Sequence, residues 1–247
     1  MTAPVKLYHE EMHANMGFFG TWLPGDPLRL GDIGVLENGR FRPQTTLTEL
    51  GVKFAGTGKG SPQNLQYTSK SGTAFSLRAG ADVQGPLPAS AEIDIKFSHE
   101  GAFLFHASNV TNESLENRLA LADSVSSLYS KGTWRKEWYL VESLYTADCA
   151  TIIISEDSSA HLVIGAASSL PLGALPLADP QVRLSVSSAS GKMVQVVGGR
   201  DLRPLYSCIR LKETWLGDVK VVPVRGTAAV PGEMPFARAS IAELLNS

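Results

Sequence analysis

The sequence predicts an α+β fold dominated by β-structure, with a twisted, largely antiparallel central sheet, a mid-chain helix and a short C-terminal helix. Most of the chain consists of short runs rich in β-branched and aromatic residues, separated by clusters of Gly, Pro, Ser and Asn. Several runs alternate apolar and polar residues, as half-buried strands do. In the middle of the chain, a three- and four-residue apolar spacing typical of a helix occurs over residues 112–129.

Length and charge place the chain among globular proteins. It has 247 residues, 43% of them hydrophobic, with 22 Lys and Arg against 24 Asp and Glu. This mixture excludes disorder over the whole chain, and the near-neutral balance argues against a nucleic-acid-binding protein. We expect one β-rich domain over residues 1–225, followed by a linker and a short helix over residues 226–247.

The N-terminal segment contains a formal zinc motif. His9-Glu10-Glu11-Met12-His13 matches H-E-x-x-H, in which a helix presents two histidines to zinc and the glutamate activates water. No third ligand stands out downstream, and Glu11 is charged where such helices are apolar. We therefore expect a solvated helix turn, with a zinc-dependent hydrolase through His9, Glu10 and His13 as an alternative. The segment also lacks the apolar stretch of a secretory signal, which predicts a cytoplasmic protein.

Two alternating runs predict a pair of antiparallel strands. Residues 74–83 alternate apolar and polar side chains, and residues 92–97 repeat the pattern. His99-Glu100-Gly101 then predicts a turn into a further strand over residues 102–107. Strands of this kind have one apolar and one polar face, a property that a membrane pore shares with an ordinary half-exposed sheet.

The predicted helix over residues 112–129 has Thr111 or Asn112 as its cap, and Leu115, Leu119, Ala122, Val125 and Tyr129 as its apolar stripe. Gly132 follows its end. Later runs predict strands over residues 138–145, 150–155, 160–166, 182–187, 192–197, 205–211 and 219–224.

Residues 158–178 form a stretch of 21 residues without Asp, Glu, Lys or Arg. Its prolines and glycines make a membrane-spanning helix a poor interpretation. A buried strand followed by a loop that covers the core fits better, and a latent lipid-facing surface is the alternative.

The C-terminal residues form a linker and a candidate helix. Residues 225–235 are rich in Gly, Pro and Ala, so the segment between Arg225 and Arg238 is a candidate site for proteolysis. Over residues 236–245, apolar side chains fall on one face of a predicted helix. The side chains of this stripe include Phe236, Ile241, Leu244 and Leu245.

No enzymatic site is recognisable. The glycine-rich segments over residues 31–34 and 56–61 lack the context of a phosphate-binding loop, and no serine stands in a nucleophile elbow. Cys149 and Cys208 are expected to be buried thiols. We read the chain as non-enzymatic and without a cofactor. A soluble β-rich binding or scaffold domain remains an alternative.

Several segments, taken in order, resemble the pore-forming domain of the gasdermin family. Gly39-Arg40-Phe41-Arg42 followed by Thr46-Leu47-Thr48-Glu49-Leu50 is similar to the family's aromatic-basic strand and the threonine-leucine segment after it. Residues 81–105 take the place of the first membrane-inserting hairpin, and residues 112–129 that of the helical segment. Tyr139-Leu140-Val141-Glu142 and residues 205–211 resemble later strands.

The resemblance implies a domain that stays soluble until a C-terminal inhibitory element is cut away by a protease. It then forms homo-oligomers on membrane lipids and inserts hairpins as a β-barrel pore, in cell death or antiviral defence, and bacterial members use a short inhibitory peptide. Membrane attachment would need basic residues, and the sequence offers two local clusters for contact with anionic lipid, with a solvated face as the other interpretation. One cluster is Lys131, Arg135 and Lys136, and the other is Arg200, Arg203, Arg210 and Lys212. The hairpin residues implied to insert are Phe75, Leu77, Val83, Ile93, Ile95, Phe97, Phe103, Phe105, Tyr139, Val141, Ile152, Ile154, Leu162 and Ile164.

Overall fold

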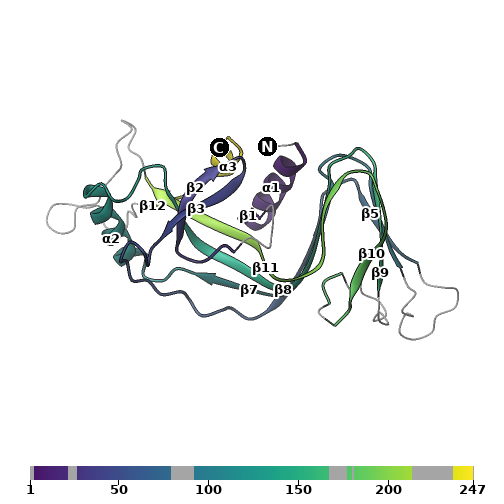
Figure 1. Ribbon diagram of the computed structural model, residues 1–247, viewed down its shortest axis with the longest axis horizontal. Helices are drawn as coiled ribbons and strands as arrows, with labels where there is room; N and C mark the ends of the chain where they lie inside the picture. Colours follow the sequence, from purple (N-terminus) through teal and green to yellow (C-terminus); the bar gives the residue numbers. More distant parts are fainter. Residues whose placement is uncertain are drawn as a thin grey trace. The chain divides into compact units, whose positions relative to one another are not determined.

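The computed structural model describes residues 3–21, 27–78, 92–166, 177–179, 181–212 and 236–246 (Figure 1). The chain divides into two compact units, and each is described by itself. Unit 1 contains residues 1–26, 61–111 and 146–204, and unit 2 contains residues 27–60, 112–145 and 205–247. The predicted β-dominated α+β fold is confirmed. The predicted domain boundary near residue 225 lies outside the described residues.

Within the described ranges, the strands form two sheets. The larger has eight strands, in the order β1-β11-β8-β2-β3, with β12 on β11 and with β7 pairing both β4 and β8. Its strands are β1 (Phe19–Gly20), β2 (Asp32–Glu37), β3 (Arg40–Thr46), β4 (Gln63–Thr68), β7 (Phe103–Ser114), β8 (Tyr139–Ser155), β11 (Met193–Leu211) and β12 (Phe236–Arg238). The smaller is antiparallel in the order β10-β9-β6-β5 and consists of β5 (Thr73–Arg78), β6 (Glu92–Phe97), β9 (Ala160–Ala166) and β10 (Leu184–Ser190).

Several strands are found at the predicted residues. β6 and β9 begin and end at the predicted residues, and the predicted turn at residues 99–101 is present, with Gly101 at a φ of 83°. The predicted runs over 138–145 and 150–155 are one strand, β8, because backbone pairing continues through the polar residues between them. The predicted strand over residues 219–224 lies outside the described residues.

The predicted start of the mid-chain helix at residue 112 is wrong. Helix α2 spans Arg118–Ser130, and residues 112–114 belong to β7. The backbone here pairs with β8 instead of forming a helix, because the Leu115 N–H donates to the Glu142 carbonyl at 2.8 Å. The cap is Asn117, in a left-handed conformation without a side-chain cap bond. Leu119, predicted to lie on the apolar face, is 71% exposed.

Helix α1 (Ala3–Met16) corrects the prediction of a solvated helix turn. Tyr8, His9 and Met12 on this helix are fully buried. The Tyr8 ring packs edge-on against Phe103, with ring centroids 5.0 Å apart. Apolar contacts of unit 1 therefore bury the face on which His9 lies. In the described part of the chain, no three His, Cys, Asp or Glu side chains gather in a way that would hold a metal ion.

Burial lowers the pKa of His9 to about 4. An unfolded histidine titrates near 6.5, so between these values the unfolded chain binds more protons and stability falls as the pH falls. For this residue alone, lowering the pH from 7.5 to 5 is expected to cost about 2 kcal/mol of unfolding free energy. Urea denaturation measures the difference in unfolding free energy between the two pH values. This difference should be smaller by the same amount in His9→Leu than in the wild type. An equal pH dependence in the two proteins would contradict the prediction.

Each unit has its own apolar core. In unit 1, β6 and β9 contribute Ile93, Ile95, Leu162 and Ile164, each at most 1% exposed. In unit 2, the core lies between sheet strands, the buried residues of α2 and the T-shaped pair Trp134 and Trp138. None of the helices in the described ranges is long and apolar enough to cross a membrane.

Candidate functional site: a two-faced sheet and a docked C-terminal segment

The four-stranded sheet of unit 1 gathers apolar side chains on one face. Direct cross-strand partners share a face of a sheet. One row across the four strands is Leu77, Ile93, Ile164 and Val186, and another is Phe75, Ile95, Leu162 and Ala189. Both rows are entirely apolar.

The opposite face is largely polar. One of its rows is Ala74, Lys96, His161 and Ser190, and the next contains Ser76, Asp94, Val163 and Ser188. The Asp94 carboxylate is 2% exposed and lies 2.7 Å from Nε2 of His161 on the neighbouring strand. The buried charge is therefore on the polar face and has a partner there.

A β-bulge keeps β10 in phase with the other strands. The register shifts between Val186 and Ser188, which leaves Ser187 as the extra residue. Without the shift, Ala189 would fall on the polar face, because Val186 and Ala189 are three residues apart. The hairpin residues named from the sequence include none of β10 (Leu184–Ser190), although a strand was predicted over residues 182–187.

The centre of the apolar face is covered by other parts of unit 1. Leu104, Ile153 and Leu177 belong to the same buried cluster, and Met193 and Val197 pack against it. The two edge strands are more open, since Phe75, Leu77 and Val186 are 40%, 37% and 40% exposed. The sheet thus folds back on its own unit with its apolar edges accessible to solvent.

A bend separates the four-stranded sheet from the strands that continue it (Figure 1). Residues 98–102 join β6 to β7, residues 156–159 join β8 to β9, and residues 191–192 join β10 to β11. Gly191, at a φ of 79°, requires glycine because a Cβ there would meet the backbone of Ala160. Short bends of this kind let each strand reverse its direction without a long loop.

The structure separates the predicted hairpin residues into three groups. Phe75, Leu77, Ile93, Ile95, Phe97, Leu162 and Ile164 lie on the apolar face of the four-stranded sheet. Phe103, Phe105, Ile152 and Ile154 are buried in β7 and β8 of unit 1. Tyr139 and Val141 belong to unit 2, and Val83 lies outside the described residues.

The C-terminal segment is a strand followed by a short helix, so the predicted continuous helix over residues 236–245 is wrong. β12 pairs antiparallel with the end of β11, with Phe236 opposite Leu211. The unpaired edge of β11 accepts these residues as a strand, which outweighs their helical spacing. α3 spans Ile241–Leu245, and Ser240 and Glu243 form a capping box at its start.

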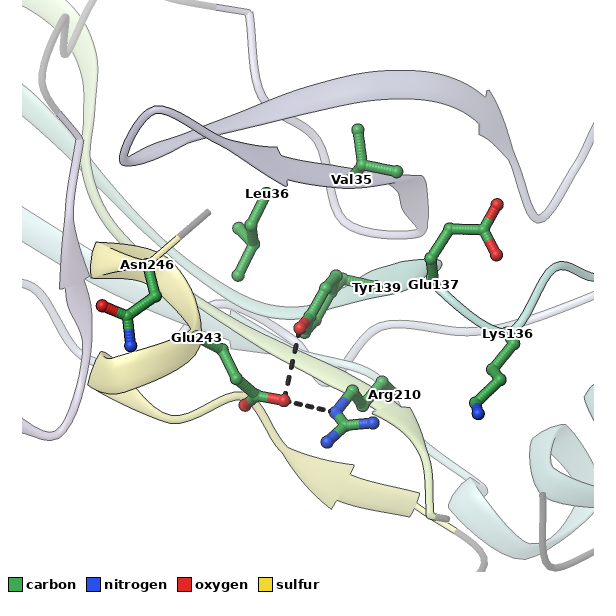
Figure 2. A pocket seen from close by; sticks show the side chains of 8 residues that line it. All are labelled: Val35, Leu36, Lys136, Glu137, Tyr139, Arg210, Glu243 and Asn246. Carbon is green, nitrogen blue, oxygen red and sulfur yellow. Dashed lines mark hydrogen bonds and ion pairs between the residues drawn. The ribbon is translucent and has the colours of Figure 1, made fainter. Parts of the chain in front are cut away.

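Buried apolar side chains and an ion pair hold this segment on unit 2. Phe236 is 8% exposed within the core, and Leu244 is fully buried. Oε1 of Glu243 lies 2.5 Å from Nε of Arg210 and accepts a hydrogen bond from the Tyr139 hydroxyl at 3.3 Å (Figure 2). Burial, followed by the charge of Glu243, raises the pKa of Tyr139 to about 12. Tyr139 therefore stays a hydrogen-bond donor at neutral pH.

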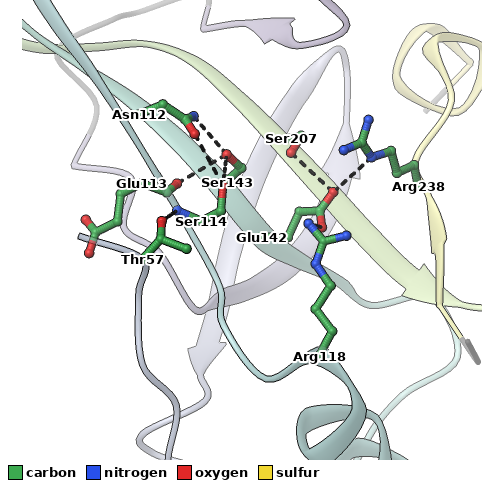
Figure 3. Close-up of polar contacts among 9 residues, drawn as sticks. All are labelled: Thr57, Asn112, Glu113, Ser114, Arg118, Glu142, Ser143, Ser207 and Arg238. Atoms are coloured by element: carbon green, nitrogen blue, oxygen red, sulfur yellow. Dashed lines mark hydrogen bonds and ion pairs between the residues drawn. The ribbon is translucent and has the colours of Figure 1, made fainter. Parts of the chain in front are cut away.

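A second ion pair joins the segment to a buried carboxylate. Glu142 on β8 is fully buried, and its carboxylate lies 2.7 Å from Arg118 of α2 and 3.2 Å from Arg238 of β12 (Figure 3). The Ser207 hydroxyl donates to the same carboxylate at 3.4 Å. Arg238, predicted to bound an exposed linker, is thus a strand residue that neutralises a buried charge. Arg225 lies outside the described residues.

The three predicted lipid-contacting residues lie between α2 and β8. Lys131 is the C-cap residue of α2, and Lys136 lines the pocket beside Arg210. The guanidinium of Arg135 lies 5.6 Å from the centre of the Trp138 ring. Their role in lipid contact stays a prediction.

No protein-family model matches the sequence, and no curated protein matches it. Among solved structures, the chain is similar to one in the cryo-EM structure of the gasdermin A3 membrane pore. The two share 12% sequence identity with a TM-score of 0.37, and the similarity covers 93% of this chain and 96% of that chain. At this identity and TM-score, the likeness is a resemblance of fold only and assigns no function to the chain.

Proposed function

We propose that this chain is a non-enzymatic pore-forming protein, held inactive by its C-terminal segment and released by proteolysis. The observation that carries the proposal is the four-stranded antiparallel sheet with one apolar and one polar face. A transmembrane β-barrel needs strands of this kind, with alternate side chains facing lipid and lumen. The resemblance of the sequence to the gasdermin pore-forming domain supports the same function.

The bend supports a change from a folded-back to an extended sheet. Within the described residues, β5 and β6 have six residues each, which is about 20 Å of strand and less than the roughly 9–11 residues that cross a bilayer. Straightening the bend would join β6 to β7 and β9 to β8, and give strands long enough to span. The same movement would expose the centre of the apolar face to lipid.

Insertion would require several copies. In the described residues, β5 and β10 are the outer strands of the four-stranded sheet. A strand edge in lipid leaves backbone groups without partners, so the edges of neighbouring copies would have to pair into a closed ring. We therefore propose a homo-oligomer in membrane lipids as the active form, and a cytoplasmic protein as the inactive one.

The C-terminal segment β12–α3 is the proposed inhibitor. We expect an activating protease to cut between residues 225 and 235, which precede β12 in the sequence. A site for a sequence-specific protease placed at residues 228–233 tests this directly. The cut protein should release dye from anionic liposomes. The uncut protein should not, and neither should the wild type, which lacks the inserted site, after treatment with the same protease.

A β-rich binding or scaffold domain is the second candidate, favoured by the burial of Phe236 in the core of unit 2. In that case the segment is a structural element, and its loss unfolds the protein. Thermal unfolding of the cut protein, after separation from the released peptide, distinguishes the two functions. A cut protein that is unfolded and leaves liposomes intact would overturn the pore-forming proposal.

A further inference from the structure

The side chain of Glu243 occupies an anion-binding position on unit 2. Its carboxylate is held by the Arg210 guanidinium and by the Tyr139 hydroxyl, at 2.5 and 3.3 Å. The side chains of Glu243 and Arg210 are only 23% and 26% exposed. Arginine and a neutral tyrosine are donors that recognise carboxylate and phosphate groups. Glu243 comes from the C-terminal segment, so it acts as an internal ligand of this site.

An open pocket of about 450 Å³ lies beside the ion pair. Figure 2 shows Val35 and Leu36 on β2 along one side of it and Lys136 on another. Among the described residues that line the pocket, Arg210 and Lys136 are basic, and Glu137 is the acid that remains once Glu243 moves away. This described lining combines basic side chains with the apolar wall of Val35 and Leu36.

We propose that this pocket binds a small amphiphilic anion, a phosphate or carboxylate group with a short apolar chain, which displaces Glu243 from Arg210 and loosens the C-terminal segment. The anion and Glu243 compete for the guanidinium of Arg210. The free energy by which a bound anion weakens docking of the segment therefore equals the free energy by which the docked segment weakens anion binding. Only the regulatory meaning of this competition rests on the proposed inhibitory role of the segment.

The same chemistry could come from a free metabolite or from a lipid headgroup. Octyl phosphate and inorganic phosphate represent soluble anions with and without an apolar chain, and phosphatidylglycerol vesicles represent the headgroup. Phosphatidylcholine vesicles, which carry no net charge, are the reference.

Three variants of the uncut full-length chain separate the contributions. Glu243→Gln removes the charge of the internal ligand but keeps the capping box, since glutamine serves at this position as well. Arg210→Gln removes the anion-binding group, and Arg210→Lys retains only its charge. Glu49→Gln is the matched control, because Glu49 makes the equivalent reciprocal bonds with Thr46 away from the pocket.

Isothermal titration with octyl phosphate should show binding that Glu243→Gln tightens about threefold to fivefold, the range expected from losing a partly exposed ion pair. Arg210→Gln should weaken binding at least tenfold, Arg210→Lys should be intermediate, and Glu49→Gln should match the wild type. Inorganic phosphate should bind more weakly than octyl phosphate. Deuterium uptake by residues 236–246 should rise when octyl phosphate is bound.

Binding to phosphatidylglycerol vesicles alone, with the same dependence on Arg210, would also support the site and would identify a headgroup as its ligand. Binding that Arg210→Gln or Glu243→Gln leaves unchanged would overturn the proposal. Equal affinity for both soluble phosphates, or unchanged deuterium uptake, would also overturn it. Liposome leakage is not a readout here, so these outcomes do not depend on whether the cut protein forms pores.

Discussion

Leu77→Arg is expected to abolish dye release by the cut protein, whereas Ser76→Arg should leave it nearly unchanged. Leu77 lies on the apolar face of β5, in the row of Ile93 and Ile164, and Ser76 lies on the polar face. An arginine facing the middle of the bilayer costs roughly 2–4 kcal/mol, and every copy in a ring would bear this cost. An arginine facing the lumen stays in water.

The two positions are well matched because both side chains are exposed in the uncut protein, with Leu77 at 37%. Thermal unfolding of both uncut variants should therefore stay close to that of the wild type. Val186→Asp and Ser188→Asp repeat the comparison on β10, where both side chains are also exposed. Equal leakage from the members of each pair would show that the apolar face does not meet lipid.

The largest loss of stability is expected when Arg118 and Arg238 are both replaced by alanine. When only one arginine is replaced, the buried Glu142 carboxylate keeps the other as its cation, either Arg118 at 2.7 Å or Arg238 at 3.2 Å. Removing both arginines leaves the Ser207 hydroxyl as the described partner of the buried carboxylate. An uncompensated buried charge costs about 3–5 kcal/mol. We expect the double variant to lose about 3 kcal/mol of unfolding free energy, because water can enter the space that the exposed arginine side chains vacate.

Urea denaturation of the two single variants and the double variant measures this coupling as a double-mutant cycle. The double loss should exceed the sum of the single losses. Adding Glu142→Gln to the double variant removes the charge and should restore much of the stability, because a neutral amide is cheaper to bury than a carboxylate. Additive single losses, or no recovery with glutamine, would show that Glu142 does not depend on these arginines.

Local patterns along the chain predicted the strands well and the choice between helix and strand poorly. The alternation of residues 92–97 and the strand-type composition of residues 160–166 placed β6 and β9 at the correct residues. The predicted helices included residues 112–115 and Phe236, but both segments form strand-type pairing with residues distant in the sequence. Spacing reports which face of an element is apolar, and the available pairing partners decide which element forms.

The sequence by itself predicted that β5 and β6 have one apolar and one polar side, because their side chains alternate along each strand. Tertiary structure decided that β9 and β10 align their apolar sides with these two strands, since the alignment depends on register and on the bulge at Ser187. It also brought Arg238 to Glu142 and Glu243 to Arg210. No spacing predicts these contacts, because chain folding alone determines which distant residues become neighbours.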